Sequence, residues 1–191
     1  VFPGDTQFSR SELMSTKKGE HLTLSSITTT VHLGAHTDAP SHYHPTGETM
    51  ESRSLELYYG PCQIITVDVP RGERILPIHL NGIEITAERV LFHTKSFPDP
   101  NHFNTDFNAL SPELIDYCAE RGVRLIGLDT PSVDPYSSKA LESHNAIFRH
   151  DMAVLEGVVL TGVEDGVYTL IALPLKIQGS DASPVRAVLI N

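Results

Sequence analysis

Most apolar segments of the chain are short runs rich in β-branched residues, a pattern typical of β-strands. One segment has helical spacing instead. Leu114 and Cys118 lie on one helical face, Ser111 can cap the first turn, Pro112 suits the first helical position and Gly122 follows the last turn. Strands are expected at residues 21–31, 62–68, 88–94, 123–129, 152–160 and 168–177, with a short apolar segment at 185–190 and a second, polar helix at 138–148.

This succession of strands with interspersed helices predicts a mixed α/β fold. The first twenty residues are polar and turn-rich, with Pro3-Gly4-Asp5 as the clearest turn signal. The sequence has no internal repeat and no obvious linker. A length of 191 residues suits one domain rather than two, so a single domain is expected over residues 1–191.

The composition narrows the range of functions. The chain has 24 acidic and 14 basic residues, a net charge of −10, which argues against binding nucleic acid or an anionic membrane surface. No apolar stretch approaches the roughly 20 residues of a membrane span. The two cysteines make no disulfide framework, so a reducing cytoplasm is the expected compartment. Ten histidines outnumber the six tyrosines and the seven phenylalanines, which points to metal or proton chemistry.

The segment from Val31 onward carries the most informative pattern. His32, His36 and Asp38 have the same parity, so they share one face if the preceding strand continues. Gly34 lies between the two histidines and leaves space for an ion or a substrate. Two imidazoles and one carboxylate suit a divalent metal such as zinc, manganese or iron, and three protein ligands leave the open position of a catalytic site.

The residue pattern leaves alternatives open. The same alternation fits a polar strand face exposed to solvent, although the presence of His42 a few residues later disfavours this interpretation. Further ligands are candidates in the second half of the chain. His144 lies on an expected helix, where a surface position is the simpler interpretation. Glu156 lies in an apolar strand, where it either faces water at an edge or needs a buried partner. The remaining histidines are interpreted as ordinary surface or core residues: His21, His44, His79, His93, His102 and His150.

The run from His32 to His42 resembles the metal motif of the cyclase-type metal-dependent hydrolases. The resemblance covers nearly the whole chain and is strongest to the kynurenine formamidase (arylformamidase) branch of that family. It is carried further by residues 3–6, 124–135, 144–156, 170–175 and 183–188.

The resemblance implies two divalent metal ions, usually zinc. His32, His36 and Asp38 match the ligands of the first ion, and His144 matches the histidine of the second. Asp38 and Glu156 match the carboxylates that the family uses to bridge or share the pair. These roles come from the resemblance, because the residue pattern alone leaves His144 and Glu156 undecided.

The implied reaction is hydrolysis of a small molecule, N-formyl-L-kynurenine, to L-kynurenine and formate, a step of tryptophan degradation. Water activated by the metals attacks the amide, and His42 matches the family's proton donor and acceptor. Phe2 stands where the family commonly has a tryptophan in the substrate pocket, so an aromatic ring remains while the indole N–H is lost.

Two competing functions remain. A related hydrolase could use the same ligands to open a cyclic amide such as isatin. A non-catalytic zinc-binding module is the other, but structural zinc sites are usually closed and cysteine-rich, and neither cysteine is near the motif.

The resemblance also implies the fold and the assembly. The family has a swivelling β/β/α domain and its members are usually dimers, so a homodimer is expected. The family's first short strand would precede Val1.

Overall fold

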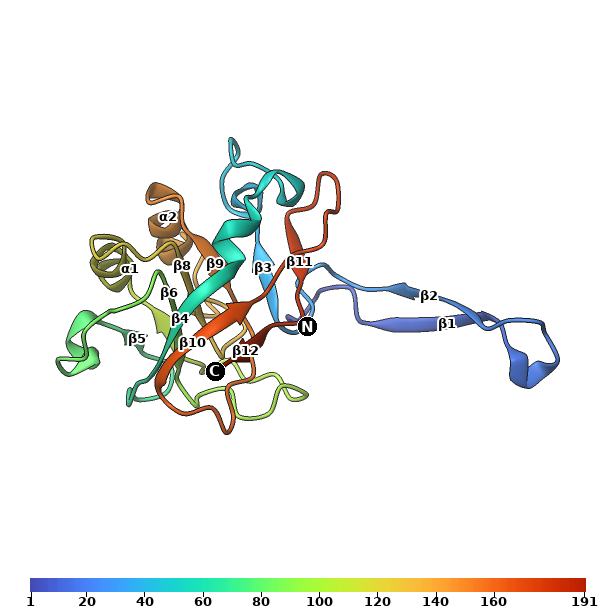
Figure 1. Ribbon diagram of the computed structural model, residues 1–191, viewed down its shortest axis with the longest axis horizontal. Helices are drawn as coiled ribbons and strands as arrows, with labels where there is room; N and C mark the ends of the chain where they lie inside the picture. The colour runs from blue at the N-terminus through green and yellow to red at the C-terminus, as the bar shows by residue number, and fades with distance from the viewer.

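A six-stranded mixed sheet forms the centre of the protein (Figure 1). The computed structural model describes residues 1–191. The strand order is β12-β10-β4-β6-β8-β9, in which β4, β6, β8 and β9 run parallel and β10 and β12 are antiparallel to their neighbours. The strands span Tyr59–Thr66 (β4), Arg89–His93 (β6), Leu125–Leu128 (β8), Ala153–Leu155 (β9), Gly166–Ile171 (β10) and Val188–Ile190 (β12).

Alternation along the strands divides the buried side chains between the two faces of the sheet. Ile65 and Phe92 point to one face and belong to the core beneath the helices α1 (Pro112–Ala119) and α2 (Glu142–Arg149). Ile64 and Leu91 point to the other face and form a second core with β10. Burial of one such side chain stabilises the fold by about 1.5–3 kcal/mol. The mixed α/β class is therefore confirmed.

The expected first helix is also confirmed. The Ser111 hydroxyl accepts a hydrogen bond from the Leu114 N–H at 3.1 Å, and Pro112 begins α1. Gly122 follows the helix with a φ of 82°, in the left-handed region that glycine adopts without strain. The polar helix α2 begins at Glu142 rather than at residue 138. Neither helix, nor any other in the chain, combines the length and apolar character needed to cross a membrane.

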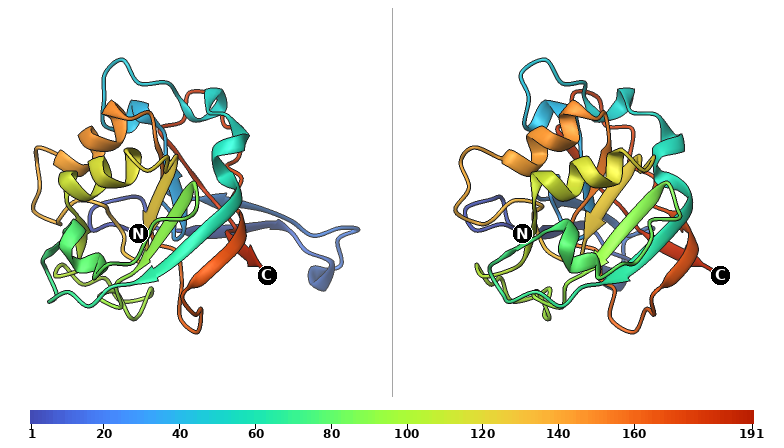
Figure 2. Two further views of the ribbon diagram at one scale, coloured as in Figure 1. Left: turned by 60° about the vertical axis from the view of Figure 1, so that its left-hand side comes forward. Right: turned by 90° about the vertical axis from the view of Figure 1, so that its left-hand side faces the viewer.

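The N-terminal region differs from its expected structure. The first twenty residues contain the strand β1 (Ser9–Met14), which pairs with β2 (Leu24–Thr28) in an antiparallel hairpin. This hairpin projects away from the sheet and helices, as Figures 1 and 2 show. The strand expected at 21–31 is therefore shorter. Its β-branched residues pair with β1 and take no part in the central sheet.

Other predicted boundaries change where the backbone turns. β9 ends at Leu155, because Gly157 has a φ of 65°. β10 begins before the expected strand at 168–177 and ends six residues short of its end, at Ile171. Short elements lie outside the predicted set: β3 (His36–Asp38), β5 (Arg74–Ile75), β7 (Ala109–Leu110), β11 (Ala182–Pro184), and 3-10 turns at Thr16–Lys18, Pro40–His42, Met50–Ser52, Leu55–Tyr58 and Pro77–Leu80.

Candidate metal centre

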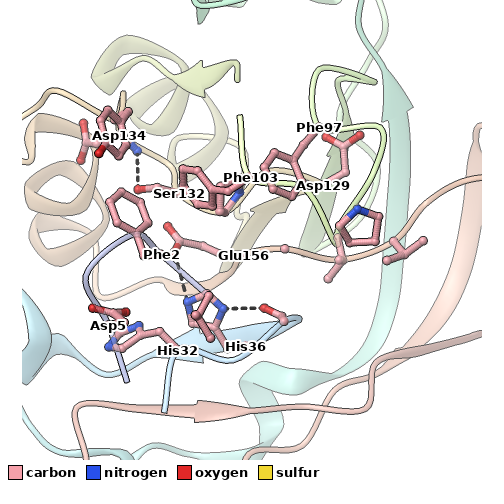
Figure 3. Close-up of a pocket in the computed structure, with 18 of the residues that line it drawn as sticks. Phe2, Asp5, His32, His36, Phe97, Phe103, Asp129, Ser132, Asp134 and Glu156 are labelled. Atoms are coloured by element: carbon pink, nitrogen blue, oxygen red, sulfur yellow. Dashed lines mark hydrogen bonds and ion pairs between the residues drawn. The ribbon is translucent and has the colours of Figure 1, made fainter. Parts of the chain in front are cut away.

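The short strand β3 places two residues of the motif beside Glu156. His36 and Asp38 share one face of β3, while Thr37 points the other way and donates to the Tyr58 hydroxyl at 3.3 Å. His36 and Glu156 exchange two backbone hydrogen bonds, each 3.0 Å long. As a result, His36 Nε2 lies 3.4 Å from Glu156 Oε2 (Figure 3). The same nitrogen lies 3.5 Å from Asp38 Oδ1.

His32 reaches the same site by a bend and not by strand parity. The expected strand does not continue: β2 ends at Thr28, and β3 begins only at His36. Between the two histidines, Gly34 has a φ of 58°, and its carbonyl accepts a hydrogen bond from His36 Nδ1 at 2.8 Å. The space that the sequence predicts at Gly34 is present, because an added Cβ would have no neighbour within 4 Å. The left-handed backbone, however, is the stronger reason for glycine at this position.

His144 joins the cluster from α2 and is held by Asp134. The His144 Nδ1–H and backbone N–H both donate to Asp134 Oδ2, at 2.8 and 3.1 Å. The other carboxylate oxygen of Asp134 accepts from the Ser143 N–H and from Arg74, each at 3.0 Å. This arrangement turns His144 Nε2 toward Asp38 Oδ2 and Glu156 Oε1, at 3.4 and 3.5 Å. Buried carboxylates that fix a histidine in this way are typical of metal sites.

Burial and charge oppose each other inside the cluster. Burial alone would raise the pKa of Asp38 and of Glu156, but the facing imidazoles hold both pKa values below their ordinary range. Burial lowers the pKa of His32, but Asp38 and Asp181 outweigh it and raise this pKa to about 9. The pKa of His144 is raised well above its ordinary value by its carboxylate neighbours, despite burial.

The donor atoms of this cluster fit a divalent cation. Both carboxylate oxygens of Asp38 and the Nε2 of His144 are buried without a well-aligned hydrogen bond, although His32 Nδ1 lies 2.9 Å from Asp38 Oδ1. Nearly all buried polar atoms in native proteins are paired, so these three atoms need another partner. Ligand atoms from His32, Asp38 and His42 lie within 4.8 Å of one another, and so do those from His36, Asp38 and Glu156. Imidazole nitrogens and carboxylate oxygens are ligands that zinc accepts.

His42 lies at the open side of the cluster with Asp181. The rings of His42 and His32 are 4.3 Å apart between centroids, and the side chain of His42 is 35% exposed. Asp181 Oδ2 is 3.4 Å from His42 Nδ1 and 3.0 Å from His32 Nε2. Asp181 was not predicted, because it lies far along the chain with no local signal. Asp134 was not predicted either, although a carboxylate in the loop after a parallel strand is a recognisable signal.

A cavity of about 1150 Å³ opens above the cluster. Phe2 lines it and stacks on Tyr136 with a centroid distance of 5.4 Å. Phe103 meets Phe2 edge-on at 5.0 Å, and Phe97 lies next to Phe103 (Figure 3). These further aromatic residues were not singled out in the sequence, although they lie in loops rich in proline. The cavity therefore has an aromatic wall over a floor of histidines and carboxylates.

Charged side chains of both signs also line the cavity. Lys95 and Lys139 are exposed on its wall, and neither forms a salt bridge within the chain. Lys95 has a φ of 60°, and its backbone N–H donates to Asp129 Oδ2 at 2.9 Å. His93, interpreted from the sequence as an ordinary histidine, lines the cavity as well and lies 3.8 Å from Asp129 Oδ2.

The mixed α/β fold and the buried histidine–carboxylate cluster define a protein built around a candidate divalent-metal centre. Residues 2–135 match the model of the family described as "Putative cyclase". The chain belongs to this family.

Curated relatives match nearly the full chain. A protein named kynurenine formamidase from Maricaulis maris is 46% identical over 190 residues, covering 99% of this chain and 90% of the relative. The kynurenine formamidase of Bordetella pertussis matches with the same identity and coverage.

Solved structures share the fold. A structure described as a potential metal-dependent hydrolase with cyclase activity has a TM-score of 0.80 at 28% identity, over 94% of this chain and 85% of that one. Isatin hydrolase A from Labrenzia aggregata has a TM-score of 0.78 over 99% of this chain and 85% of that one. The sequence identity to this isatin hydrolase is 22%, so the similarity shows a shared fold alone.

Proposed function

We propose that this protein hydrolyses N-formyl-L-kynurenine to L-kynurenine and formate with the help of two divalent metal ions, zinc in the first place. The observation that carries the proposal is the buried meeting of three imidazoles with two carboxylates, among which both oxygens of Asp38 lack a well-aligned hydrogen bond. The full-length similarity to kynurenine formamidases supports the substrate.

Five residues are the proposed metal ligands: His32, His36, Asp38, His144 and Glu156. Asp38 is central, because one of its oxygens faces His32 and His36 while the other faces His144. This position supports a carboxylate shared by two ions. Divalent ions held here would supply Lewis-acid activation of water and of the amide carbonyl.

His42 is proposed to move the proton. Its Nδ1 faces Asp181 Oδ2 at 3.4 Å, which leaves Nε2 free to accept a proton from water and to return it to the leaving nitrogen. An arylamine is a poor leaving group as an anion, so the C–N bond breaks readily only if that nitrogen is protonated. A positioned acid–base group of this kind contributes about 10²–10⁴-fold to the rate.

The cavity has features that suit both ends of the substrate. Phe2, Phe103 and Tyr136 offer stacking and edge contacts for an aryl ring. Lys95 and Lys139 can pair with the carboxylate of an amino-acid side arm. Carboxyl recognition distinguishes N-formyl-L-kynurenine from a simple formanilide.

The competing functions receive less support. The isatin hydrolases resemble the chain at about half the identity of the formamidases, so ring opening of isatin is not favoured. A structural zinc module is also disfavoured, because both cysteines are buried away from the cluster and His42 leaves its open side accessible.

The proposal includes three further points. One domain spans residues 1–191, supported by the contribution of both halves of the chain to the cluster. The free thiols of Cys62 and Cys118 support a reducing cytoplasmic compartment. A homodimer, which the family resemblance implies, is supported by the projecting hairpin β1–β2.

The decisive experiment adds the purified protein to N-formyl-L-kynurenine and follows the appearance of kynurenine. The assay is repeated after chelation and after return of zinc, and isatin is tested in parallel. Turnover of the linear amide that is lost on chelation and restored by zinc is expected. No turnover by protein that holds two metals per chain would refute the substrate, and turnover unaffected by metal removal would refute the metal site.

A further inference from the structure

One carboxylate oxygen at the open side of the cluster faces two histidines at once. Asp181 Oδ2 lies 3.0 Å from His32 Nε2 and 3.4 Å from His42 Nδ1. The two imidazole rings are themselves neighbours, with 4.3 Å between their centroids. One of these histidines is a proposed metal ligand and the other is the proposed acid–base group. Asp181 therefore joins the proposed metal site to the group that moves the proton.

Strand pairing fixes the backbone at Asp181. The strand β11 follows directly and pairs antiparallel with β3, which places Ala182 opposite Asp38 (Figure 1). The Asp181 carbonyl accepts a hydrogen bond from the Ala39 N–H at 2.8 Å. The pairing that builds the metal motif thus also sets the position of the Asp181 side chain, although the two segments are distant along the chain.

The contact with His32 decides which ring nitrogen faces the proposed ligands. Asp38 Oδ1 lies 2.9 Å from His32 Nδ1, while Asp181 faces the other nitrogen. An ionised carboxylate only accepts hydrogen bonds, so His32 Nε2 carries the proton that it shares with Asp181. A neutral imidazole has a single N–H, which leaves Nδ1 free to bind a metal. A carboxylate that accepts the remaining N–H of a metal-binding histidine orients the ring and makes it a stronger ligand.

The contact with His42 decides the tautomer of the acid–base group. By the same rule, Asp181 favours a proton on His42 Nδ1 and leaves Nε2 free to accept another. The separation of 3.4 Å is long for a hydrogen bond, but contacts of acid–base groups are often long before a substrate binds and shorten in the reactive complex. Without Asp181, His42 can adopt either tautomer, and the one with its proton on Nε2 cannot accept a proton there.

We propose that Asp181 is a positioning residue that orients both the metal ligand His32 and the acid–base group His42 through one shared carboxylate oxygen. The role of His42 rests on the proposed function, whereas the contact with His32 concerns metal binding alone. Two separable effects follow from a single side chain. Loss of the carboxylate should weaken metal binding through His32 and slow the reaction through His42.

Zinc affinity tests the contact with His32. Asp181→Ala should bind the weaker zinc ion about 10–100-fold less tightly, as measured by competition against a chromogenic chelator, and should still bind two ions at high zinc concentration. Glu51→Ala is the matched control, because Glu51 accepts the Gly179 N–H at 3.0 Å and so supports the same loop without contacting either histidine. This control should bind zinc as the unaltered protein does, and circular dichroism verifies that each variant is folded. An unchanged affinity in Asp181→Ala would refute the orientation of His32, and permanent loss of one ion would make Asp181 a ligand instead.

NMR of the zinc-loaded protein tests the contact with His42 without any substrate. Long-range proton–nitrogen spectra in mildly alkaline solution distinguish a ring nitrogen that carries a proton from one that does not. The His42 signals are assigned by their absence in His42→Ala. His42 should carry its proton on Nδ1 in the unaltered protein and in Glu51→Ala, and should be a mixture of tautomers in Asp181→Ala. An unchanged tautomer in Asp181→Ala would refute the orientation of His42.

A double-mutant cycle on kcat separates positioning from a general structural role. At saturating zinc, Asp181→Ala should lower kcat by about 10²-fold, with KM little changed. In the His42→Ala background the same substitution should lower kcat by no more than about twofold, because the group through which Asp181 acts is already gone. Zinc affinity should still fall by about 10–100-fold in that background, since His32 is intact.

Equal losses of kcat in both backgrounds would overturn the proposal. No turnover of N-formyl-L-kynurenine by the unaltered protein would instead refute the proposed function. The zinc affinity and the tautomer of His42 would then decide the role of Asp181, because neither measurement depends on hydrolytic activity.

Discussion

Asp134→Asn should weaken metal binding at His144 without removing a ligand. The carboxylate now accepts the Nδ1–H of His144 at 2.8 Å, which leaves Nε2 as the atom that can bind a metal. An asparagine in the same rotamer has two orientations. Its NH₂ group lies opposite either the His144 Nδ1–H or the Ser143 N–H, which donates to Asp134 at 3.0 Å. The first orientation favours the opposite tautomer, in which Nε2 carries the proton and cannot coordinate.

The size of the effect follows from these contacts. Loss of a partner that orients a metal-binding histidine costs about 10–100-fold in metal affinity, which corresponds to about 1.4–2.8 kcal/mol. The fold should also lose about 1.5–3 kcal/mol, the usual contribution of a hydrogen bond to a charged group. Competition against a chromogenic chelator measures the affinity, and urea unfolding of the chelated protein measures the stability.

The same variant should change the acid sensitivity of the chelated protein. Burial would raise the pKa of Asp134, but His144 and the Ser143 N–H outweigh burial and hold this pKa below its ordinary value. A lowered pKa in the folded state stabilises the protein above the unfolded pKa of about 4, and this contribution is lost as the pH falls below it. Asp134→Asn removes that contribution, so the variant should lose less stability between neutral and acid pH than the unaltered protein.

Asp165→Asn provides the control. Asp165 also accepts hydrogen bonds, from the Thr66 N–H and hydroxyl, but it is exposed and does not line the cavity. This variant should bind metal as the unaltered protein does. The orienting role of Asp134 is refuted if Asp134→Asn binds both metals with unchanged affinity. It is also refuted if Asp165→Asn lowers the metal affinity by the same factor.

The remaining predictions concern the metals, the proton and the substrate's carboxylate. His42→Ala should retain both metals, as measured by elemental analysis, and lower kcat by about 10²–10⁴-fold; loss of a metal would make His42 a ligand instead. Asp38→Ala should lose metal and activity together, and full metal occupancy in this variant would contradict the role of Asp38 as a shared ligand. Chelation should lower the Tm by about 5–11 °C, since ligand at 100 times its Kd stabilises by about 2.7 kcal/mol and each kcal/mol shifts the Tm by about 2–4 °C. An unchanged melting curve would argue against a resident metal. Lys95→Met should raise KM for N-formyl-L-kynurenine by about 10-fold with formanilide unaffected, and an equal change for both would refute carboxylate recognition.

Local sequence signals predicted the elements that depend on neighbouring residues. The cap, the first-turn proline and the helical spacing predicted α1, and short β-branched runs predicted the central strands, because these preferences act over a few residues. The shared face of His36 and Asp38 followed from strand alternation. Strand alternation did not place His32, because a bend at Gly34 replaces the strand there. Alternation holds only where a strand has a partner.

The residue pattern was weakest where distant segments meet. It left His144 and Glu156 undecided, and only the family resemblance singled them out. The sheet register brings Glu156 against His36, and α2 brings His144 within 3.4 Å of Asp38. Neither contact has a local signal, because each joins residues separated by more than a hundred positions.

The sequence by itself determined the mixed α/β class, the central strands, the first helix and the chemical character of the metal motif. Tertiary structure alone decided that Asp134 orients His144, that Asp181 faces His42, and that the β1–β2 hairpin stands outside the core. The physical reason is the range of the interactions. Propensity, capping and alternation act within one element, whereas the convergence of charged groups depends on strand pairing and packing across the whole chain.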